Sequence, residues 1–422
     1  MKMKIIETIE QFISGDWGEE NYSEATPCKV VCVRGADIVP IDNNDFRHIP
    51  TRYISQQSFD TKCLHAGDIV VEKSGGSPTQ STGRVAYISQ ELIDSVGPVV
   101  CSNFCVAFRA NEKWNPLYVF YYLQHVYNCG VFFNFEGKTS GLKNLQLEAA
   151  YKAVPIEDVD RAQQDKIVSI LDGIHRKMTV NRQINQNLEK MAKQLYDYWF
   201  VQFDFPNEEG KPYKSSGGKM VWNEKIKREI PIDWEILPLF DAVSVQYGFP
   251  FATEQFTEEE TSVPIVRIRD ILEGTTSAYS LEKADEKYHL NENDVLVGMD
   301  GNFHMNFWHD NIAYLNQRCV RLRAHSDSTI SSIQILHSIK PYIKAKEQNA
   351  KGSTVGHLSD KDLKGLYLIK PLKTRVFNSR KTLDGLLALV IENKKQILSL
   401  TKQRDELLPL LMNGQVSPPN CD

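Results

Sequence analysis

The sequence predicts an α/β fold of the α+β type, with two homologous globular domains separated by two long antiparallel helices that form a coiled coil. Three observations support this prediction. The chain has 422 residues, more than one hydrophobic core usually serves; its motifs occur twice in the same order; and each half ends in a long helical pattern. The expected order is a first domain at 1–160, a helix at 161–205, a linker at 206–231, a second domain at 232–372, a helix at 373–414 and a tail at 415–422.

The composition is that of a folded protein with no membrane partner. Hydrophobic residues make up 41% and charged residues 24% of the chain. No apolar run approaches the roughly eighteen residues of a membrane span, and the first residues, "MKMKIIETIEQF", carry acids where a secretory signal is apolar. We therefore expect a cytoplasmic protein. Because the net charge is −5, any nucleic acid must bind at a local basic surface.

Three pairs of segments carry the repeat. "AGDIVVEKSGG" (66–76) corresponds to "ENDVLVGMDGN" (292–302), each an alternating strand followed by a polar loop with glycine. "VCSNFCVAFR" (100–109) corresponds to "YLNQRCVRLR" (314–323), with Cys-Val at the same place. "KTSGLKNLQLEAAYKAVPI" (138–156) corresponds to "KGSTVGHLSDKDLKGLYLIKP" (351–371). The order is the same in both halves, which indicates a duplicated domain.

The two helical patterns share one register, in which Asp172-Gly173 falls on Asp384-Gly385. Their apolar period of about 3.5 is that of a coiled-coil seam. The seam residues are Ile174, Met178, Asn181, Leu188, Leu195, Leu386, Val390, Asn393, Leu400 and Leu407. Antiparallel pairing could bring Asn181 close to Asn393 and select the register, and the alternative is that both face solvent. Helices of about 40 residues span about 60 Å and would hold the domains apart.

Two homologous modules at a set separation suit an extended ligand that is read at two places. Duplex DNA is such a ligand, and paired modules read half-sites whose spacing the protein scaffold sets. Since the two modules differ in sequence, the two half-sites should differ as well.

The residues also carry a family resemblance. "GDIVVEKSGGSPTQSTGRVAYI" (67–88), "NDVLVGMDGNFHM" (293–305), the "GLKNL" and "VGHL" elements and "NQNLEKMAKQLYDYWFVQFDFP" (185–206) together resemble the specificity subunit of a Type I restriction-modification system. The resemblance covers nearly the whole chain. It implies two target-recognition domains joined by a helical ruler, and a bipartite, asymmetric site on double-stranded DNA.

The resemblance also implies partners. Two methyltransferase subunits would modify adenine with S-adenosylmethionine, and restriction subunits would use ATP and Mg²⁺, so this chain would hold no cofactor, no metal and no catalytic residue. The alternatives are a recognition subunit of a related methyltransferase system, a coiled-coil scaffold with two protein-binding modules, and a stand-alone enzyme.

Motifs that would indicate an enzyme are incomplete. "EGKTSG" contains Gly-Lys-Thr, but Phe132 stands where a phosphate-binding loop needs its first glycine. "NPLY" (115–118) has Leu117 where an adenine methyltransferase loop has a second proline, and it reads better as an Asn cap with proline in the first helical turn. The eight cysteines lack the spacing of zinc or redox pairs, which favours buried strand positions.

Contacts with DNA need donors and acceptors on loops for base edges, and cations or backbone N–H groups for phosphates. Two loops in each domain offer such groups. The candidates in the first domain are Lys73, Ser74, Gly75, Gly76, Thr79, Gln80, Ser81, Thr82, Arg84, Lys138, Thr139, Ser140, Lys143 and Asn144. Those in the second are Asn302, His304, Asn306, His309, Lys351, Ser353, Thr354 and His357.

Each of these assignments has a structural alternative. The first loop of each domain could be a solvated connection, and Phe303, Phe307 and Trp308 fit a core better than a wedge in DNA. The later loops, 138–144 and 351–357, could clamp phosphate or be structural turns. Polar helix faces at 175–183 and 392–404 could approach the DNA spacer or face solvent. We expect methyltransferase docking at the aromatic residues Tyr196, Tyr198, Trp199 and Phe200.

Overall fold

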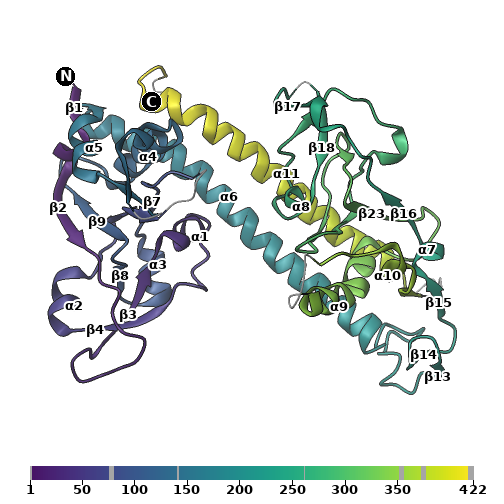
Figure 1. Cartoon of the computed structure of the whole chain (residues 1–422). Coiled ribbons are helices and arrows are strands. Elements are labelled where there is room, and N and C mark those ends of the chain that lie inside the picture. Colours follow the sequence, from purple (N-terminus) through teal and green to yellow (C-terminus); the bar gives the residue numbers. More distant parts are fainter. Residues whose placement is uncertain are drawn as a thin grey trace. The chain divides into compact units, whose positions relative to one another are not determined.

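The computed structural model describes residues 2–75, 80–139, 142–260, 262–350, 356–371 and 377–416, and Figure 1 shows the chain. It contains two compact units, Met1–Thr179 with Ser399–Asp422 and Val180–Leu398. In the part of the chain that is described, no helix combines the length and apolar content needed to cross a bilayer.

The first unit contains twelve strands and six α-helices among its described residues. Its strands are β1 (Lys2–Lys4), β2 (Ile9–Ser14), β3 (Cys28–Val33), β4 (Thr51–Ile54), β5 (Ile69–Glu72), β6 (Ser74–Gly75), β7 (Val85–Tyr87), β8 (Val99–Cys101), β9 (Cys105–Ala110), β10 (Glu136–Thr139), β11 (Leu142–Leu145) and β12 (Pro155–Glu157). Its helices are α1 (Ile38–Asp42), α2 (Gln56–Lys62), α3 (Gln90–Val96), α4 (Pro116–Asn128), α5 (Leu147–Ala153) and the beginning of α6 (Arg161–Tyr196).

An antiparallel sheet, β2-β9-β5-β7, forms the centre of the first unit, and a mixed sheet, β4-β3-β8, lies beside it. Strand β5 is buried on both faces, as its continuous apolar run indicates. Ile69 and Val71 pack with α4 and the end of the second long helix, α11 (Ser379–Met412), whereas Val70 packs on the opposite face with β3 and β8. The core therefore has two layers, one on each side of the central sheet.

The second unit repeats this order. Its strands are β13 (Met220–Asn223), β14 (Arg228–Pro231), β15 (Glu235–Pro238), β16 (Val243–Tyr247), β17 (Phe256–Thr257), β18 (Val263–Val266), β19 (Tyr279–Ser280), β20 (Val295–Gly298), β21 (Met305–Phe307), β22 (Tyr314–Leu315), β23 (Cys319–Ala324) and β24 (Tyr367–Lys370). Its helices are α7 (Leu239–Ala242), α8 (Ile268–Glu273), α9 (Ser332–Ala350), α10 (Asp360–Lys364) and most of α11 (Ser379–Met412).

The two units share their sheet topology, which confirms the predicted duplication. The strand order β16-β23-β20-β21 matches β2-β9-β5-β7. The second sheet of each unit contains one parallel pair, β3 with β8 in the first unit and β18 with β22 in the second. A buried carboxylate occupies the same place in both. Asp68 receives two hydrogen bonds from Arg109, at 2.8 and 2.9 Å, and Asp294 receives two from Arg323, at 2.6 and 2.7 Å.

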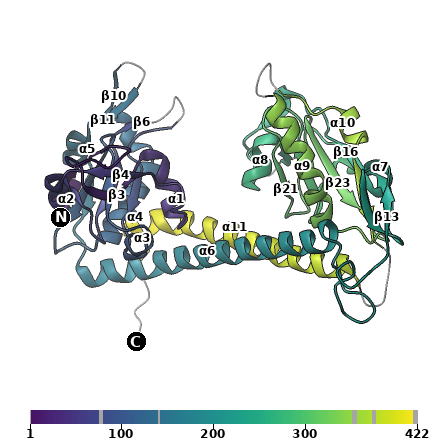
Figure 2. The same ribbon diagram turned by 90° about the horizontal axis from the view of Figure 1, so that it is seen from below.

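The long helices α6 and α11 pair in antiparallel fashion and lie side by side in Figure 2. Their seam contains amides, but the pairing differs from the expectation. Asn393 Nδ2 donates to Asn185 Oδ1 at 2.9 Å, and Asn181 Nδ2 donates to Gln396 Oε1 at 3.1 Å. The predicted pair of Asn181 with Asn393 is therefore wrong by one helical turn.

Burial within α6 explains the shift. Leu171, Met178, Asn185 and Ala192 recur every seven residues and are all buried, whereas Ile174, Asn181, Leu188 and Leu195 are half-buried. On α11, Val390 is buried and the other predicted seam residues, Leu386, Asn393, Leu400 and Leu407, are half-buried. Apart from Met178 and Val390, which are buried, the predicted positions thus flank the centre of the seam, which passes through Asn185.

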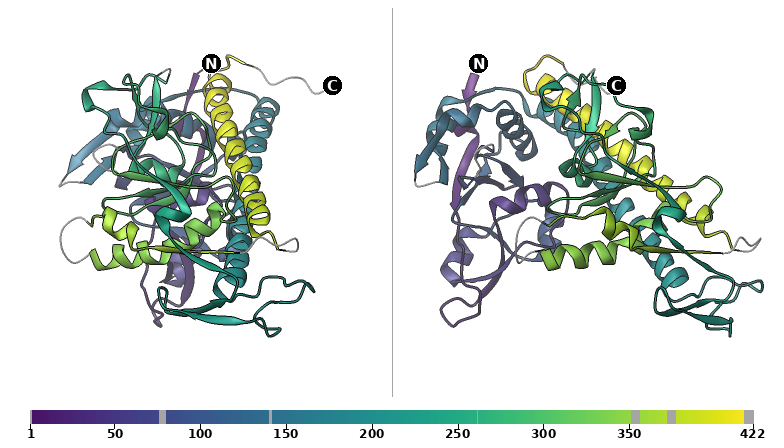
Figure 3. Two further views of the ribbon diagram at one scale, coloured as in Figure 1. Left: turned by 90° about the vertical axis from the view of Figure 1, so that its right-hand side faces the viewer. Right: turned by 45° about the vertical axis from the view of Figure 1, so that its right-hand side comes forward.

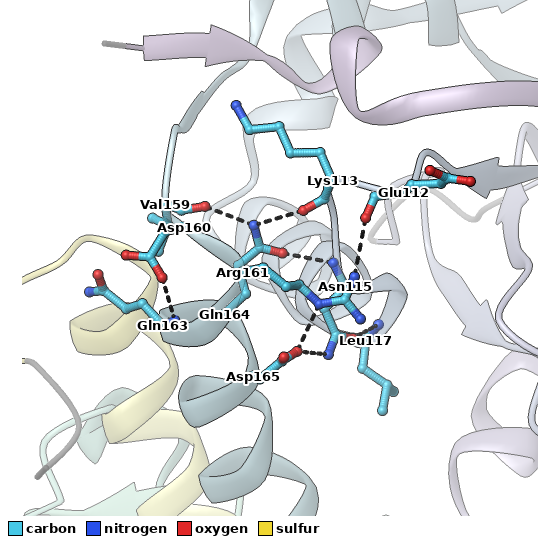
Figure 4. A network of polar contacts seen from close by, with 10 residues as sticks. All are labelled: Glu112, Lys113, Asn115, Leu117, Val159, Asp160, Arg161, Gln163, Gln164 and Asp165. Atoms are coloured by element: carbon cyan, nitrogen blue, oxygen red, sulfur yellow. Dashed lines mark hydrogen bonds and ion pairs between the residues drawn. The ribbon is translucent and has the colours of Figure 1, made fainter.

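The beginning of α6 is fixed by polar contacts to the beginning of α4 (Figure 4). Asn115 caps α4 by accepting a hydrogen bond from Leu117 N at 2.9 Å, with Pro116 in the first turn. Gln164 is fully buried; its Oε1 accepts from Asn115 N at 2.7 Å, and its Nε2 donates to Val159 O at 2.8 Å. The "NPLY" segment is therefore a helix cap, as expected, and it positions the long helix.

Most of the aromatic residues at the end of α6 and in the π-helical turn after it, Asp197–Val201, are buried within the second unit. Tyr196, Trp199 and Phe200 are at most 9% exposed and pack with Trp234 and Phe377. Figures 1 and 3 show that the chain then turns into the hairpin of β13 and β14 beyond this helix end. This corrects the expected docking surface, because of the four predicted residues only Tyr198, which is 37% exposed, can meet a partner.

Replacing Trp199 by alanine should therefore destabilise the second unit. The indole packs edge-on against Phe377, with ring centres 5.2 Å apart, and removing a buried aromatic ring costs about 3–5 kcal/mol of unfolding free energy. Denaturant unfolding measures this loss. Tyr198→Ala is the matched control and should cost less than about 1 kcal/mol. If Trp199→Ala kept full stability and lost only its association with a methyltransferase, the docking assignment would stand instead.

Candidate nucleic-acid interface

Three segments of the first unit meet at one end of its sheets. They are the connection from β5 to β7, the turn between β8 and β9, and the hairpin of β10 and β11. The backbone N–H groups of Lys73 and Ser74 both donate to Phe104 O at 2.9 Å, and Leu145 N donates to Lys73 O at 2.8 Å. Strand β6 also pairs with β11. Figure 2 shows β6, β10 and β11 together at one end of this unit.

The second unit has two of these three bonds at equivalent positions. Met299 N donates to Arg318 O, and Leu358 N donates to Met299 O, both at 2.8 Å. Side chains join the segments as well. His357 Nδ1 lies 2.6 Å from Asp300 Oδ1, where the first unit has Ser74 Oγ donating to Asn144 Oδ1 at 2.5 Å. The later loops therefore support the first loop of each unit at their shared base.

Several predicted contact residues of the first unit are engaged inside the protein. Arg84 donates to both oxygens of Glu72, at 2.7 and 2.8 Å, and this carboxylate raises the pKa of Arg84. Thr82 is fully buried and its N–H donates to Glu136 Oε1 at 2.6 Å. Lys143 Nζ donates to Gln80 O at 3.0 Å and lies 3.4 Å from Glu136 Oε2. These residues shape the loop.

The remaining candidates of the first unit are more open. Lys73 is exposed, and Ser74, Gly75, Gln80 and Ser81 are half-buried. The backbone of Lys138 and Thr139 belongs to β10, paired with Lys143 and Leu142. Gly76, Thr79 and Ser140 lie outside the described residues. Among the candidates whose side chains are described, Lys73 is thus a cation that is placed to meet a phosphate.

The second unit has an open hollow of about 530 Å³ in this region. Asn302 and His304 line it, as do three arginines and the turn before β23; the full lining is Arg267, Ile268, Arg269, Asn302, His304, Asn316, Gln317 and Arg318. The side chains of Arg269 and Arg318 are 68% and 60% exposed. The hollow combines guanidinium groups with neutral amides, as base and phosphate recognition requires.

Other predicted residues of the second unit point inward. Asn306 donates to Ile271 O at 3.1 Å, and its Oδ1 accepts from Lys394 Nζ at 3.2 Å. His309 is 6% exposed and packs on Trp308, and its burial lowers its pKa. Phe303 and Trp308 belong to the core, as the sequence favoured. Lys351, Ser353 and Thr354 lie outside the described residues. Asn306 and His309 therefore hold the loop in place.

The sequence analysis missed the turn residues. Asn103 and Phe104 in the first unit, and Gln317 and Arg318 in the second, are exposed between two buried strands. The signal was present in the repeat, because "VCSNFCV" and "YLNQRCV" share the Cys-Val that begins the following strand and carry unlike residues at these two central positions. Arg267 and Arg269 follow β18, and they were also missed.

Within the described ranges, no group of three or more His, Cys, Asp or Glu side chains could hold a metal ion. Of the described cysteines, Cys32, Cys101, Cys105 and Cys319 are buried as expected, whereas Cys28 and Cys63 are half-buried and Cys129 is exposed. Burial raises the pKa of the Cys32 thiol to about 12. The buried thiols act as small apolar side chains in or beside the sheets.

Comparison with known proteins gives a consistent result. A family model, the Type I restriction modification DNA specificity domain, matches residues 39–190 and 231–399. The specificity subunit of the Type I restriction enzyme EcoBI from Escherichia coli is 31% identical over 194 residues, which are 45% of this chain and 40% of that protein. The specificity subunit of MjaIX from Methanocaldococcus jannaschii is 27% identical over 275 residues, which are 63% and 61%. The matches thus span less than two thirds of either relative.

A solved structure has a similar fold. The S subunit of a Type I restriction-modification system from M. genitalium aligns over 98% of this chain and 96% of its own, with a TM-score of 0.54 and 13% sequence identity. At that identity the likeness concerns the fold alone.

Proposed function

The chain belongs to the family of Type I restriction modification DNA specificity domains, and from that premise we propose that it is the DNA-recognition subunit of a Type I restriction-modification system. It binds a bipartite, asymmetric double-stranded site, with one half-site for each unit. The observation that carries the proposal is the duplicated interface, in which the same backbone bonds support different exposed side chains in the two units.

The two exposed sets support different half-sites. The first unit presents Lys73, Asn103 and Phe104, and the second presents Arg269, Gln317 and Arg318. Cations of this kind orient a protein on the phosphate backbone, and the amides and the guanidinium fork read base edges. Since equivalent loops carry unlike side chains, a palindromic target is not expected.

We further propose that catalysis resides in partner subunits. Methyltransferase subunits would methylate adenine with S-adenosylmethionine, restriction subunits would cut DNA with ATP and Mg²⁺, and the complex would work in the cytoplasm. Tyr198 and the exposed apolar side chains of α6, which are Val180, Ile184 and Met191, would meet the methyltransferase subunits.

Selection from a random duplex pool tests the proposal. The full chain is purified with a methyltransferase subunit of its system, and bound DNA is sequenced after several rounds. The expected result is one split motif with two unlike half-sequences and a spacer of constant length. Enrichment of a palindrome or of no motif would contradict the proposal, and capture of protein with no DNA binding would favour a scaffold.

A further inference from the structure

The two turns that the repeat places at equivalent positions present unlike side chains from the same scaffold. Cys105 N donates to Ser102 O at 2.9 Å, and Cys319 N donates to Asn316 O at 3.3 Å, so each turn closes onto the next strand. The third residue of each turn, Phe104 or Arg318, accepts the backbone bonds that hold the neighbouring loop. Its side chain remains free to project outward, and Phe104 is 56% exposed.

Arg318 has an unusual backbone for its residue type. Its φ is +66°, a left-handed conformation that favours glycine, and a residue with a β-carbon is strained there. Its contact inside the protein is an exposed ion pair with Asp300 at 3.4 Å, and such pairs contribute little to folding. A strained residue whose visible partner is weak is a candidate for function.

Arg318 and Phe104 can make different contacts with the edges of DNA bases. A guanidinium fork bonds to O6 and N7 of guanine in the major groove, and this is the commonest specific contact. Gln317 and Asn302, beside it in the hollow, offer amides that suit adenine. A phenyl ring at the equivalent place has no such bond to offer, but it can pack on the methyl group of thymine.

We infer that these turns are specificity determinants: Arg318 reads a guanine in the half-site of the second unit, and Phe104 favours a thymine in the half-site of the first. The inference rests on the proposed function and deepens it. It assigns a base preference to each unit from one structurally equivalent position. It also accounts for the unlike residues at these positions, directly before the Cys-Val that both units share.

The test uses the full chain with its methyltransferase subunit and the same random duplex pool. Arg318→Ala should lower the preference for guanine at one position of one half-site by roughly 5- to 150-fold, the range expected for one bidentate contact. The other half-site and the spacer should be unchanged. Phe104→Ala is the matched variant and should relax one position of the opposite half-site only.

Two further variants separate base reading from phosphate contact and from folding. Arg318→Lys keeps the positive charge but loses the guanidinium fork. If Arg318→Ala lowered the affinity for DNA, Arg318→Lys restored it, and neither variant changed a base preference, the side chain would contact a phosphate and the inference would be overturned. Arg318→Gly removes the left-handed strain, so its melting temperature should not fall while the guanine preference is lost. If the unmodified chain selects no split motif, the proposed function itself fails; if it does and Arg318→Ala selects the same motif, only the inference fails.

Discussion

Gly15→Ala and Gly248→Ala should each strongly destabilise the unit that contains the changed residue. A β-carbon at Gly15 would lie 2.0 Å from Ser102 O, and one at Gly248 would lie 1.9 Å from Asn316 O. Both obstacles are backbone carbonyls at the start of the turns that carry the proposed readers, so no side-chain rotation can relieve the contact. We expect a loss of about 4 kcal/mol or more of unfolding free energy, measured by denaturant unfolding.

The same substitution in the long helices should have the opposite sign. A β-carbon at Gly173 in α6 or at Gly385 in α11 meets no atom within 4 Å, and alanine favours a helix over glycine by roughly 1 kcal/mol. Gly173→Ala controls for Gly15→Ala in the first unit, and Gly385→Ala controls for Gly248→Ala in the second. Equal effects at all four positions would show that the close approach at the turns does not govern stability.

The duplication and the long helices were predictable because both leave periodic signals. Segments that repeat in order report one architecture used twice, and an apolar period sustained over four heptads reports a seam. The register of that seam was missed by one turn because an asparagine, Asn185, occupies a central position where apolar residues were counted. A search for periodic apolar residues does not detect a polar residue in the seam.

The candidate site was predicted only in outline. Polarity and glycine content predicted which segments follow the strands, but the role of each side chain in them depends on partners that are distant in sequence. Arg84 is engaged by Glu72, and Lys143 by Glu136. The aromatic end of α6 was misread for the same reason, since Phe377, which covers it, lies far along the chain.

At one contact beside the site, the two units place glycine and the larger side chain at opposite positions. In the first, a β-carbon at Gly35 would lie 2.5 Å from Glu72 Oε1; in the second, a β-carbon at Gly298 would lie 2.9 Å from Ile268 Cγ2. The larger side chain thus comes from the central sheet in one unit and from the neighbouring helix start in the other. This exchange places the carboxylate that holds Arg84 in the first unit only, so one scaffold carries two different loops.

Arg109→Met should cost about 3 kcal/mol of unfolding free energy, because it leaves Asp68 buried without its counter-ion. The Asp68 side chain is 1% exposed and Arg109 is 31% exposed, and a buried pair that loses one partner is destabilised by about 3–5 kcal/mol. We expect the lower end because water reaches part of the guanidinium and because His65 N also donates to Asp68, at 2.7 Å. Arg323→Met should act alike on Asp294 in the second unit.

A double-mutant cycle separates the cost of the stranded carboxylate from the loss of packing. Asp68→Asn combined with Arg109→Met removes both charges, so the double variant should be more stable than Arg109→Met alone, by on the order of 1–2 kcal/mol. Lys152→Met, which breaks the exposed pair with Glu148, is the control and should leave the free energy of unfolding nearly unchanged. If the losses of unfolding free energy in Asp68→Asn and Arg109→Met summed to the loss in the double variant, the carboxylate and the guanidinium would not be coupled. The pair would then stabilise the two sheets through packing alone.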